Sequence, residues 1–182
     1  MKTLSQLALV GLVAFAFGST ALVGQSAYAQ SGKASVDVYN FWKTQGWQKN
    51  AQHQARSLYY YGQTPQPISP PQAKEHATAV RESIVASQKS LGELKKSNPD
   101  NKEAQAAIAK IGEIHAKVLG HCDMLDKSLG KTDTAEMCAC CADIHHDLEG
   151  ADAEMTKLMK ALKIEKLDLP KRDSQPAAPA KK

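Results

Sequence analysis

The sequence has few aromatic residues, and none of them follows Gly62. Phenylalanine, tryptophan and tyrosine together make up 5% of the 182 residues. The rest of the chain is rich in Ala, Leu, Ile, Lys and Glu, a composition typical of long helices. The formal net charge is only +4, and acidic and basic residues are mixed along the predicted helices. This mixture excludes the strongly basic surface that nucleic-acid-binding proteins present.

Motifs of the common enzyme classes are also missing. The chain has no Gly-rich phosphate loop and no Gly-x-Ser-x-Gly nucleophile motif. The haem-attachment motif Cys-x-x-Cys-His is absent, because Ala142 follows Cys138 and Cys141 where the motif requires histidine. A nucleophile pair of Cys141 and His145 would need an oxyanion-binding arrangement, for which the sequence offers no candidate. We therefore predict that the protein is not an enzyme.

Only one hydrophobic run approaches the length of a membrane span, and it lies near the N-terminus. Leu7 to Val23 is apolar, follows the basic Lys2, and precedes the small-residue pattern Ser26 to Ala29. This layout predicts a secretory signal peptide over residues 1–29 and a periplasmic or secreted protein. An uncleaved run would instead form an anchor, which is the only membrane contact that the sequence suggests.

The remaining chain divides into four segments. Residues 30–63 hold most of the aromatic side chains, and residues 64–71 form a Pro-rich linker that no helix can cross. Residues 72–169 are predicted to fold as a helical bundle, and residues 170–182 as a disordered basic tail. The aromatic segment can add a fourth, shorter helix, and together with the basic tail it is a candidate contact for a protein of the cell envelope.

Apolar residues recur at alternating spacings of three and four through the predicted bundle. They form one seam from Ala73 to Leu94, a second from Ala104 to Leu129, and a third from Met137 to Leu162. The connections between the seams are short. We therefore predict an all-α fold, an antiparallel up-down bundle of three long helices with coiled-coil-like packing.

Cysteine and histidine are concentrated in one stretch, Ile114 to His146. It contains all four cysteines and four of the six histidines. His115 and Cys122 lie on the second seam, about 10.5 Å apart along the helix. Cys138, Cys141 and His145 form one stripe on the third helix.

Folding the second and third helices about Gly130 places Cys122 at the height of Cys138, with Cys141 within about one turn. The same count about Pro99 brings His76 beside Cys122. Two layers result, one of sulfur with His76 and one of imidazole further from the turn. The six candidate metal ligands are His76, His115, Cys122, Cys138, Cys141 and His145.

Thiolate and imidazole together suit copper(I) or zinc(II), since both ions accept soft or borderline ligands. Two other interpretations stay open. In an oxidising compartment a disulfide from Cys122 to Cys138 or Cys141 would staple a structural bundle that binds no metal. A thiol redox role would require a solvent-accessible thiol with a low pKa.

The run Met137-Cys138-Ala139-Cys140-Cys141, with Cys122 and histidines on neighbouring helices, resembles the copper-storage proteins, which are four-helix bundles lined inside by cysteines. The resemblance covers the architecture from about Pro71 to Leu169. It implies copper binding in the interior of the bundle. Those proteins carry many more cysteines than the four of this chain, so the resemblance implies one small site rather than high-capacity storage.

Overall fold

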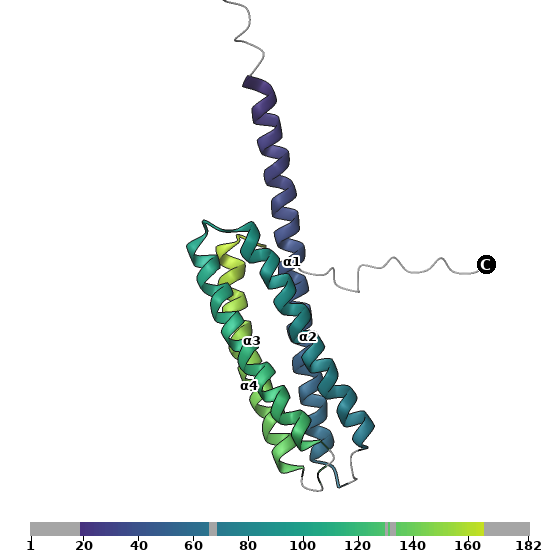
Figure 1. The fold of residues 1–182 in the computed structure, drawn as a ribbon. Coiled ribbons are helices and arrows are strands. Elements are labelled where there is room, and N and C mark those ends of the chain that lie inside the picture. The colour runs from purple at the N-terminus through teal and green to yellow at the C-terminus, as the bar shows by residue number, and fades with distance from the viewer. Residues whose placement is uncertain (1–18, 66–68, 130, 132–133, 166–182) are drawn as a thin grey trace, which may run out of the picture.

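The computed structural model describes residues 19–65, 69–129, 131 and 134–165, with side chains from residue 35 onward. This part of the chain forms four helices and no strand. They are α1 (Ser19–Gly62), α2 (Pro70–Ser97), α3 (Lys102–Ser128) and α4 (Ala135–Ala161). Successive helices run in opposite directions (Figure 1). The predicted all-α antiparallel bundle is therefore confirmed, with four helices rather than three long ones.

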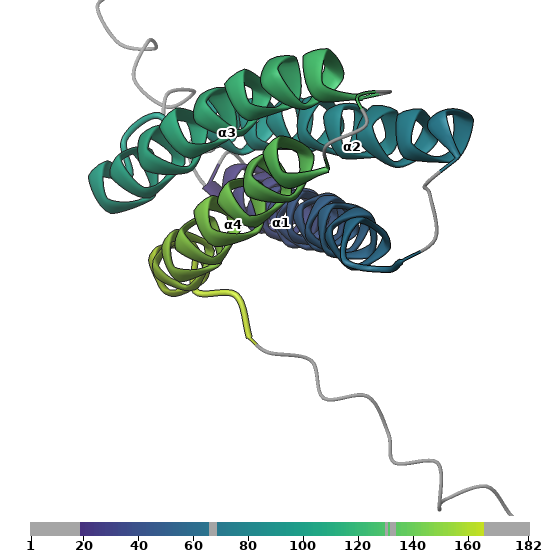
Figure 2. The same cartoon turned by 90° about the horizontal axis from the view of Figure 1, so that it is seen from below.

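In Figure 2, α2 and α3 lie on one side of the bundle and α1 and α4 on the other. Each packs against its neighbours in sequence, and α1 also packs against α4, which closes the bundle. The α3–α4 turn and the α1–α2 connection lie at one end (Figure 1). The N-terminal part of α1 projects beyond the opposite end.

The aromatic segment forms a full-length member of the bundle because its buried residues follow a helical period. The period is difficult to recognise in the sequence, since many of these positions are polar. Phe41, Ala51, Ala55 and Leu58 are fully buried and apolar. The polar buried residues of α1 are Asp37, Asn40, Thr44, Gln48 and Gln52.

Prolines set both limits of α2. Ser69 is the N-cap residue in an extended conformation, and Pro70 and Pro71 fill the first helical positions, where no backbone donor is needed. The helix ends at Ser97, shortly before Pro99. Asn101 then caps α3, because its side chain accepts a hydrogen bond from the Ala104 amide at 3.0 Å.

The end of α4 lies at Ala161, well before Pro170. The backbone turns there because Lys163 adopts a left-handed conformation, with φ of 55°. This turn buries Ile164, which is 8% exposed, against the end of the bundle. The predicted tail, residues 170–182, and the first 18 residues of the predicted signal peptide lie outside the described residues.

The core consists of two apolar clusters stacked along the bundle axis. We call the cluster near the α3–α4 turn the cysteine-end cluster and the other the distal cluster. The larger members of the cysteine-end cluster besides the cysteines are Leu58, Val80, Ile84, Val118, Leu125, Met137, Ile144 and Leu148. The larger members of the distal cluster are Phe41, Leu91, Leu94, Ile108, Ile111, Met155, Leu158 and Ile164.

None of the helices in the described part is both long enough and apolar enough to span a membrane. Helix α1 is continuous across Ala29 and Gln30, where the sequence predicts cleavage. Cleavage itself stays a prediction.

Asp37 joins α1 to the end of α2, and its removal tests whether this contact stabilises the bundle. Its carboxylate accepts hydrogen bonds from the Ser97 hydroxyl at 2.5 Å and the Asn98 amide at 3.1 Å. Because Asp37 is 7% exposed, Asp37→Ala removes two hydrogen bonds to a buried carboxylate, and both donors keep only their bonds within the end of α2, including those to the Leu94 carbonyl. We expect a loss of about 2 kcal/mol in the free energy of unfolding, measured by denaturant titration. The control Asp100→Ala removes an exposed carboxylate at the same end of the bundle and should change stability little.

Candidate functional site

All four cysteines lie together where α3 ends and α4 begins. Cys122 is near the end of α3, and Cys138, Cys140 and Cys141 are in the first two turns of α4. They are 0–6% exposed, and all four are free thiols. Apolar side chains of the cysteine-end cluster surround them. The sequence thus brings four sulfur atoms from two helices into one buried region.

The three thiols of α4 face different neighbours, because 3.6 residues complete one helical turn. Cys138 lies with its sulfur 3.8 Å from the Tyr59 carbonyl oxygen, to which it donates a weak hydrogen bond. Cys141 also faces α1, where it lines a pocket. Cys140 lies close enough to Cys122 that a charge on it raises the pKa of the Cys122 thiol.

The six candidate ligands predicted from the sequence do not include Cys140, which lies outside the stripe of Cys138, Cys141 and His145. In the structure Cys140 is 6% exposed and belongs to the cysteine-end cluster. One signal could have found it. Cys140 lies three residues after Met137 and four before Ile144, and both of these are seam positions.

Three of the buried thiols are held in their neutral form by a raised pKa. Burial raises the pKa of Cys141 to about 12, and repulsion from the other three cysteines adds to the effect. Burial also raises the pKa of Cys122 to about 11, against the opposing effect of Arg81. The pKa of Cys140 is raised by burial and by the nearby Glu136. At neutral pH these thiols are poor nucleophiles, so they offer no support for a redox role.

His76 lies between α1 and α2 rather than in the interior. Its Nδ1 atom is 2.6 Å from the Gln54 side-chain oxygen. Its ring packs against Tyr61, with 5.5 Å between ring centroids. Both contacts are on α1, so the structure places His76 against that helix.

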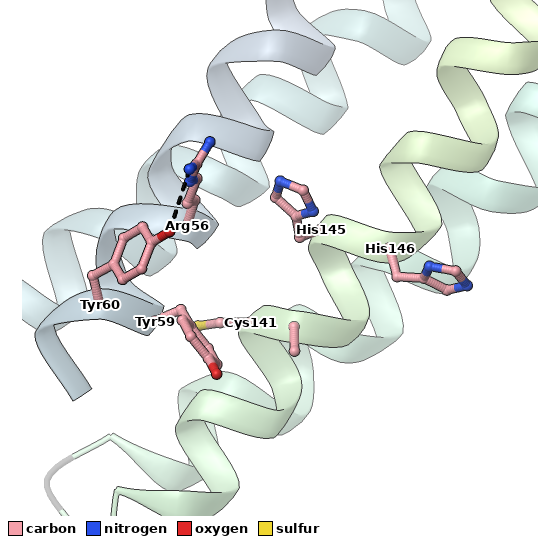
Figure 3. A pocket seen from close by; sticks show the side chains of 7 residues that line it. Arg56, Tyr59, Tyr60, Cys141, His145 and His146 are labelled. Atoms are coloured by element: carbon pink, nitrogen blue, oxygen red, sulfur yellow. Dashed lines mark hydrogen bonds between the residues drawn. The ribbon is translucent and has the colours of Figure 1, made fainter. Parts of the chain in front are cut away.

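His145 lies in a pocket of about 390 Å³ between α1 and α4. Figure 3 shows its ring on the α1 side of α4, whereas the ring of His146 projects away from α1. Arg56 donates a hydrogen bond to the Tyr60 hydroxyl at 3.2 Å on the opposite wall. The pocket residues are Arg56, Tyr59, Tyr60, Cys141, Ala142, His145 and His146.

His115 occupies a polar layer that separates the two apolar clusters. Thr44, Gln48, Ser87 and His115 are each 0% exposed and fall between the clusters along α1, α2 and α3. The hydroxyls of Thr44 and Ser87 donate to backbone carbonyls, at 2.8 and 3.1 Å. The ring nitrogens of His115 and the amide atoms of Gln48 have no hydrogen-bond partner among the described residues.

Burial lowers the pKa of His115 to about 4, so its imidazole is neutral at pH 7. A buried polar group without a partner costs about 1–3 kcal/mol. The polar layer therefore reduces the stability of the bundle in its middle.

The structure thus brings Cys122, Cys138 and Cys141 to one end of the bundle and gives the three candidate histidines separate surroundings. His76 contacts α1, His115 lies in the polar layer, and His145 lies in the pocket. Among the described residues, no three side chains of His, Cys, Asp or Glu are arranged to hold a metal ion. The sequence pattern thus predicts that the three thiols lie at one level along the bundle. It does not predict which neighbouring helix each histidine side chain faces.

Comparisons with known proteins add no relative. No protein-family model matches the chain, and no match was found among curated proteins or solved structures.

We expect His115 to make the bundle sensitive to acid. In the unfolded chain its pKa is near 6.5, whereas in the folded chain it is about 4. Above pH 6.5 neither state binds a proton, so the folded state keeps its full stability. Below that pH the unfolded state is protonated first, and about 3 kcal/mol of stability is lost by pH 4.

The substitution His115→Leu should remove this part of the pH dependence and stabilise the protein most at low pH. Urea unfolding at several pH values measures it as the difference between variant and wild type. His53→Leu changes an exposed histidine and serves as the control. A difference between His115→Leu and wild type that stays constant from pH 7 to pH 4 would contradict the prediction.

Proposed function

We propose that this protein is exported and binds copper(I) without catalysing a reaction, in copper sequestration or delivery. The main support is that four free thiols from α3 and α4 are buried together at one end of the bundle. Thiolate sulfur is a soft ligand that favours copper(I).

Copper(I) fits this arrangement better than zinc(II) does. A structural zinc ion takes four ligands in a tetrahedron, usually with histidine completing a set of thiolates. Here His76 packs against α1, and His145 shares its pocket with only one thiol, Cys141, so among the described residues no histidine completes a set of three thiolates. Copper(I) forms stable linear complexes with a pair of thiolates. Cys122 on α3 with Cys140 or Cys141 on α4 would supply such a pair.

Metal binding is also compatible with thiols whose pKa is raised. Binding releases the thiol proton and replaces it with the ion, so the protein without metal keeps uncharged sulfur in its core. Protonated cysteine behaves there as a small apolar residue. The same four residues can therefore stabilise the empty bundle and ligate the metal.

The substitutions Cys122→Ser and Cys141→Ser test the thiol ligands. We expect each to weaken copper(I) binding by about tenfold or more, because each removes a soft ligand that serine oxygen does not replace. Affinity is measured anaerobically by competition with a chromophoric copper(I) chelator on reduced protein. Ala107→Ser is a matched control, since it introduces a hydroxyl into the buried face of α3 away from the thiols.

Failure of the wild-type protein to take copper(I) from a weak chelator would refute the proposal. If the protein binds zinc(II) more tightly than copper(I), then zinc(II) rather than copper(I) is its metal. Fewer than four free thiols in denatured protein purified without reductant would favour the disulfide-stapled structural bundle.

The affinity for copper(I) should fall as the pH falls. The pKa values of Cys122 and Cys141 are about 11 and 12, so both thiols are protonated throughout the neutral range. Each must therefore lose a proton when it binds the ion. We expect the affinity to change by about tenfold per pH unit for each thiolate that binds. Chelator competition from pH 6 to 8 measures the slope, and a pair of thiolates predicts about a hundredfold per unit. A pH-independent affinity would exclude protonated thiols as the source of the ligands.

A further inference from the structure

We propose that the pocket between α1 and α4 is the route by which copper(I) reaches the buried thiols, with His145 as its first ligand and Cys141 as the thiol that receives it. This inference rests on the proposed copper binding. It adds a transient metal site and a direction of transfer.

Cys141 is the only cysteine that lines this pocket, although the residue is 0% exposed. Its sulfur points toward α1 beside Tyr59 (Figure 3). Cys141 therefore belongs both to the pocket lining and to the cysteine-end cluster. Of the four thiols, it is the one that an ion entering between α1 and α4 would meet first.

His145 is placed to bind the ion before Cys141 does. It lies four residues after Cys141, on the same face of α4 and about 6 Å further along the helix. Its side chain is 35% exposed, and its Nδ1 atom is 3.8 Å from the Glu149 carboxylate. The imidazole thus remains accessible from the pocket.

Transfer from His145 to Cys141 needs no oxidant or reductant. The lone pair of the imidazole first binds the copper(I) ion. The Cys141 thiol then releases its proton to water in the pocket, and its thiolate forms a bond to the ion as the copper–nitrogen bond breaks. Copper stays in the +1 state throughout, and one proton leaves for each thiolate bond formed.

The wall opposite His145 favours a monovalent ion carried by an anionic donor. Arg56 lies over the Tyr60 ring, with its guanidinium carbon 5.5 Å from the ring centroid. Its fixed positive charge repels a bare divalent cation more strongly than a monovalent one. The same charge attracts an anionic complex that delivers copper.

The experiment compares the rate of copper(I) uptake with its stoichiometry. Copper(I) is supplied as the anionic bathocuproine disulfonate complex, and loss of its absorbance is followed by stopped flow. We expect His145→Ala to slow uptake roughly tenfold while the final stoichiometry stays unchanged. Ala142→Trp, which fills the pocket from an exposed position, should also slow uptake.

His53→Ala is the control, because this histidine is exposed and does not line the pocket. Its uptake rate should equal that of the wild type. An unchanged rate in His145→Ala, or an equal slowing in His53→Ala, overturns the proposed route. Far-ultraviolet circular dichroism verifies that each variant keeps its helical content.

A second readout needs no copper binding and so separates this inference from the proposed function. Methylmercury substitutes for a thiol proton, and mass spectrometry of timed digests gives the reaction rate of each cysteine. We expect Ala142→Trp to slow the reaction of Cys141 roughly tenfold and to leave that of Cys140, which does not line the pocket, unchanged. If Cys141 reacts at the wild-type rate in Ala142→Trp, or if Cys140 is slowed equally, the pocket is not the route, whether or not the protein binds copper.

Discussion

The contact between α1 and α4 is the constraint on which the rest of the structure depends, because it converts two helical hairpins into a closed bundle. Lys49 and Gln52 of α1 both contact the carboxylate of Asp152 on α4. At the cysteine end, the Thr134 hydroxyl donates to the Gly62 carbonyl at 3.1 Å. Without this contact Cys141 would lie on an open surface and lose the burial that raises its pKa. The pocket that Cys141 lines exists for the same reason.

The sequence predicts well how far along the bundle axis a side chain lies. It predicts poorly which neighbouring helix that side chain faces. Turn positions and helical rise are enough to bring Cys122 level with Cys138 and Cys141. Direction depends on which helices are neighbours, and that requires α1, whose buried face includes Asp37 and Gln48. The hydrophobic pattern therefore predicts only α2, α3 and α4 as long helices. The residues that contact His76 lie on α1, which the pattern does not predict as a full-length helix. Cys140 is absent from the predicted ligands for a similar reason. The buried face of α4 is wide enough to include two adjacent cysteines, Cys140 and Cys141.

The core combines two departures from apolar packing that differ in their effect on stability. The polar layer leaves His115 and Gln48 without partners among the described residues, which costs free energy that no contact there recovers. The thiols cost little while they stay protonated, because a neutral cysteine packs as a small apolar side chain. Raised pKa values at Cys122 and Cys141 are the sign of that state. The bundle can therefore hold reactive groups in its interior without exposing them or charging them.

Charge also favours the proposed copper(I) over zinc(II) as the metal for these thiols. Four thiolates around one zinc ion would leave two negative charges in an apolar region, where unpaired charge is costly. Two thiolates around one copper(I) ion leave only one, and a further copper ion bridging the same sulfurs would cancel it. Arg81 opposes the rise in the pKa of Cys122, so a positive charge lies near the single negative charge. Burial already disfavours the thiolate form of these cysteines. Copper(I), which needs two thiolates rather than four, therefore places less negative charge in the core than zinc(II) does.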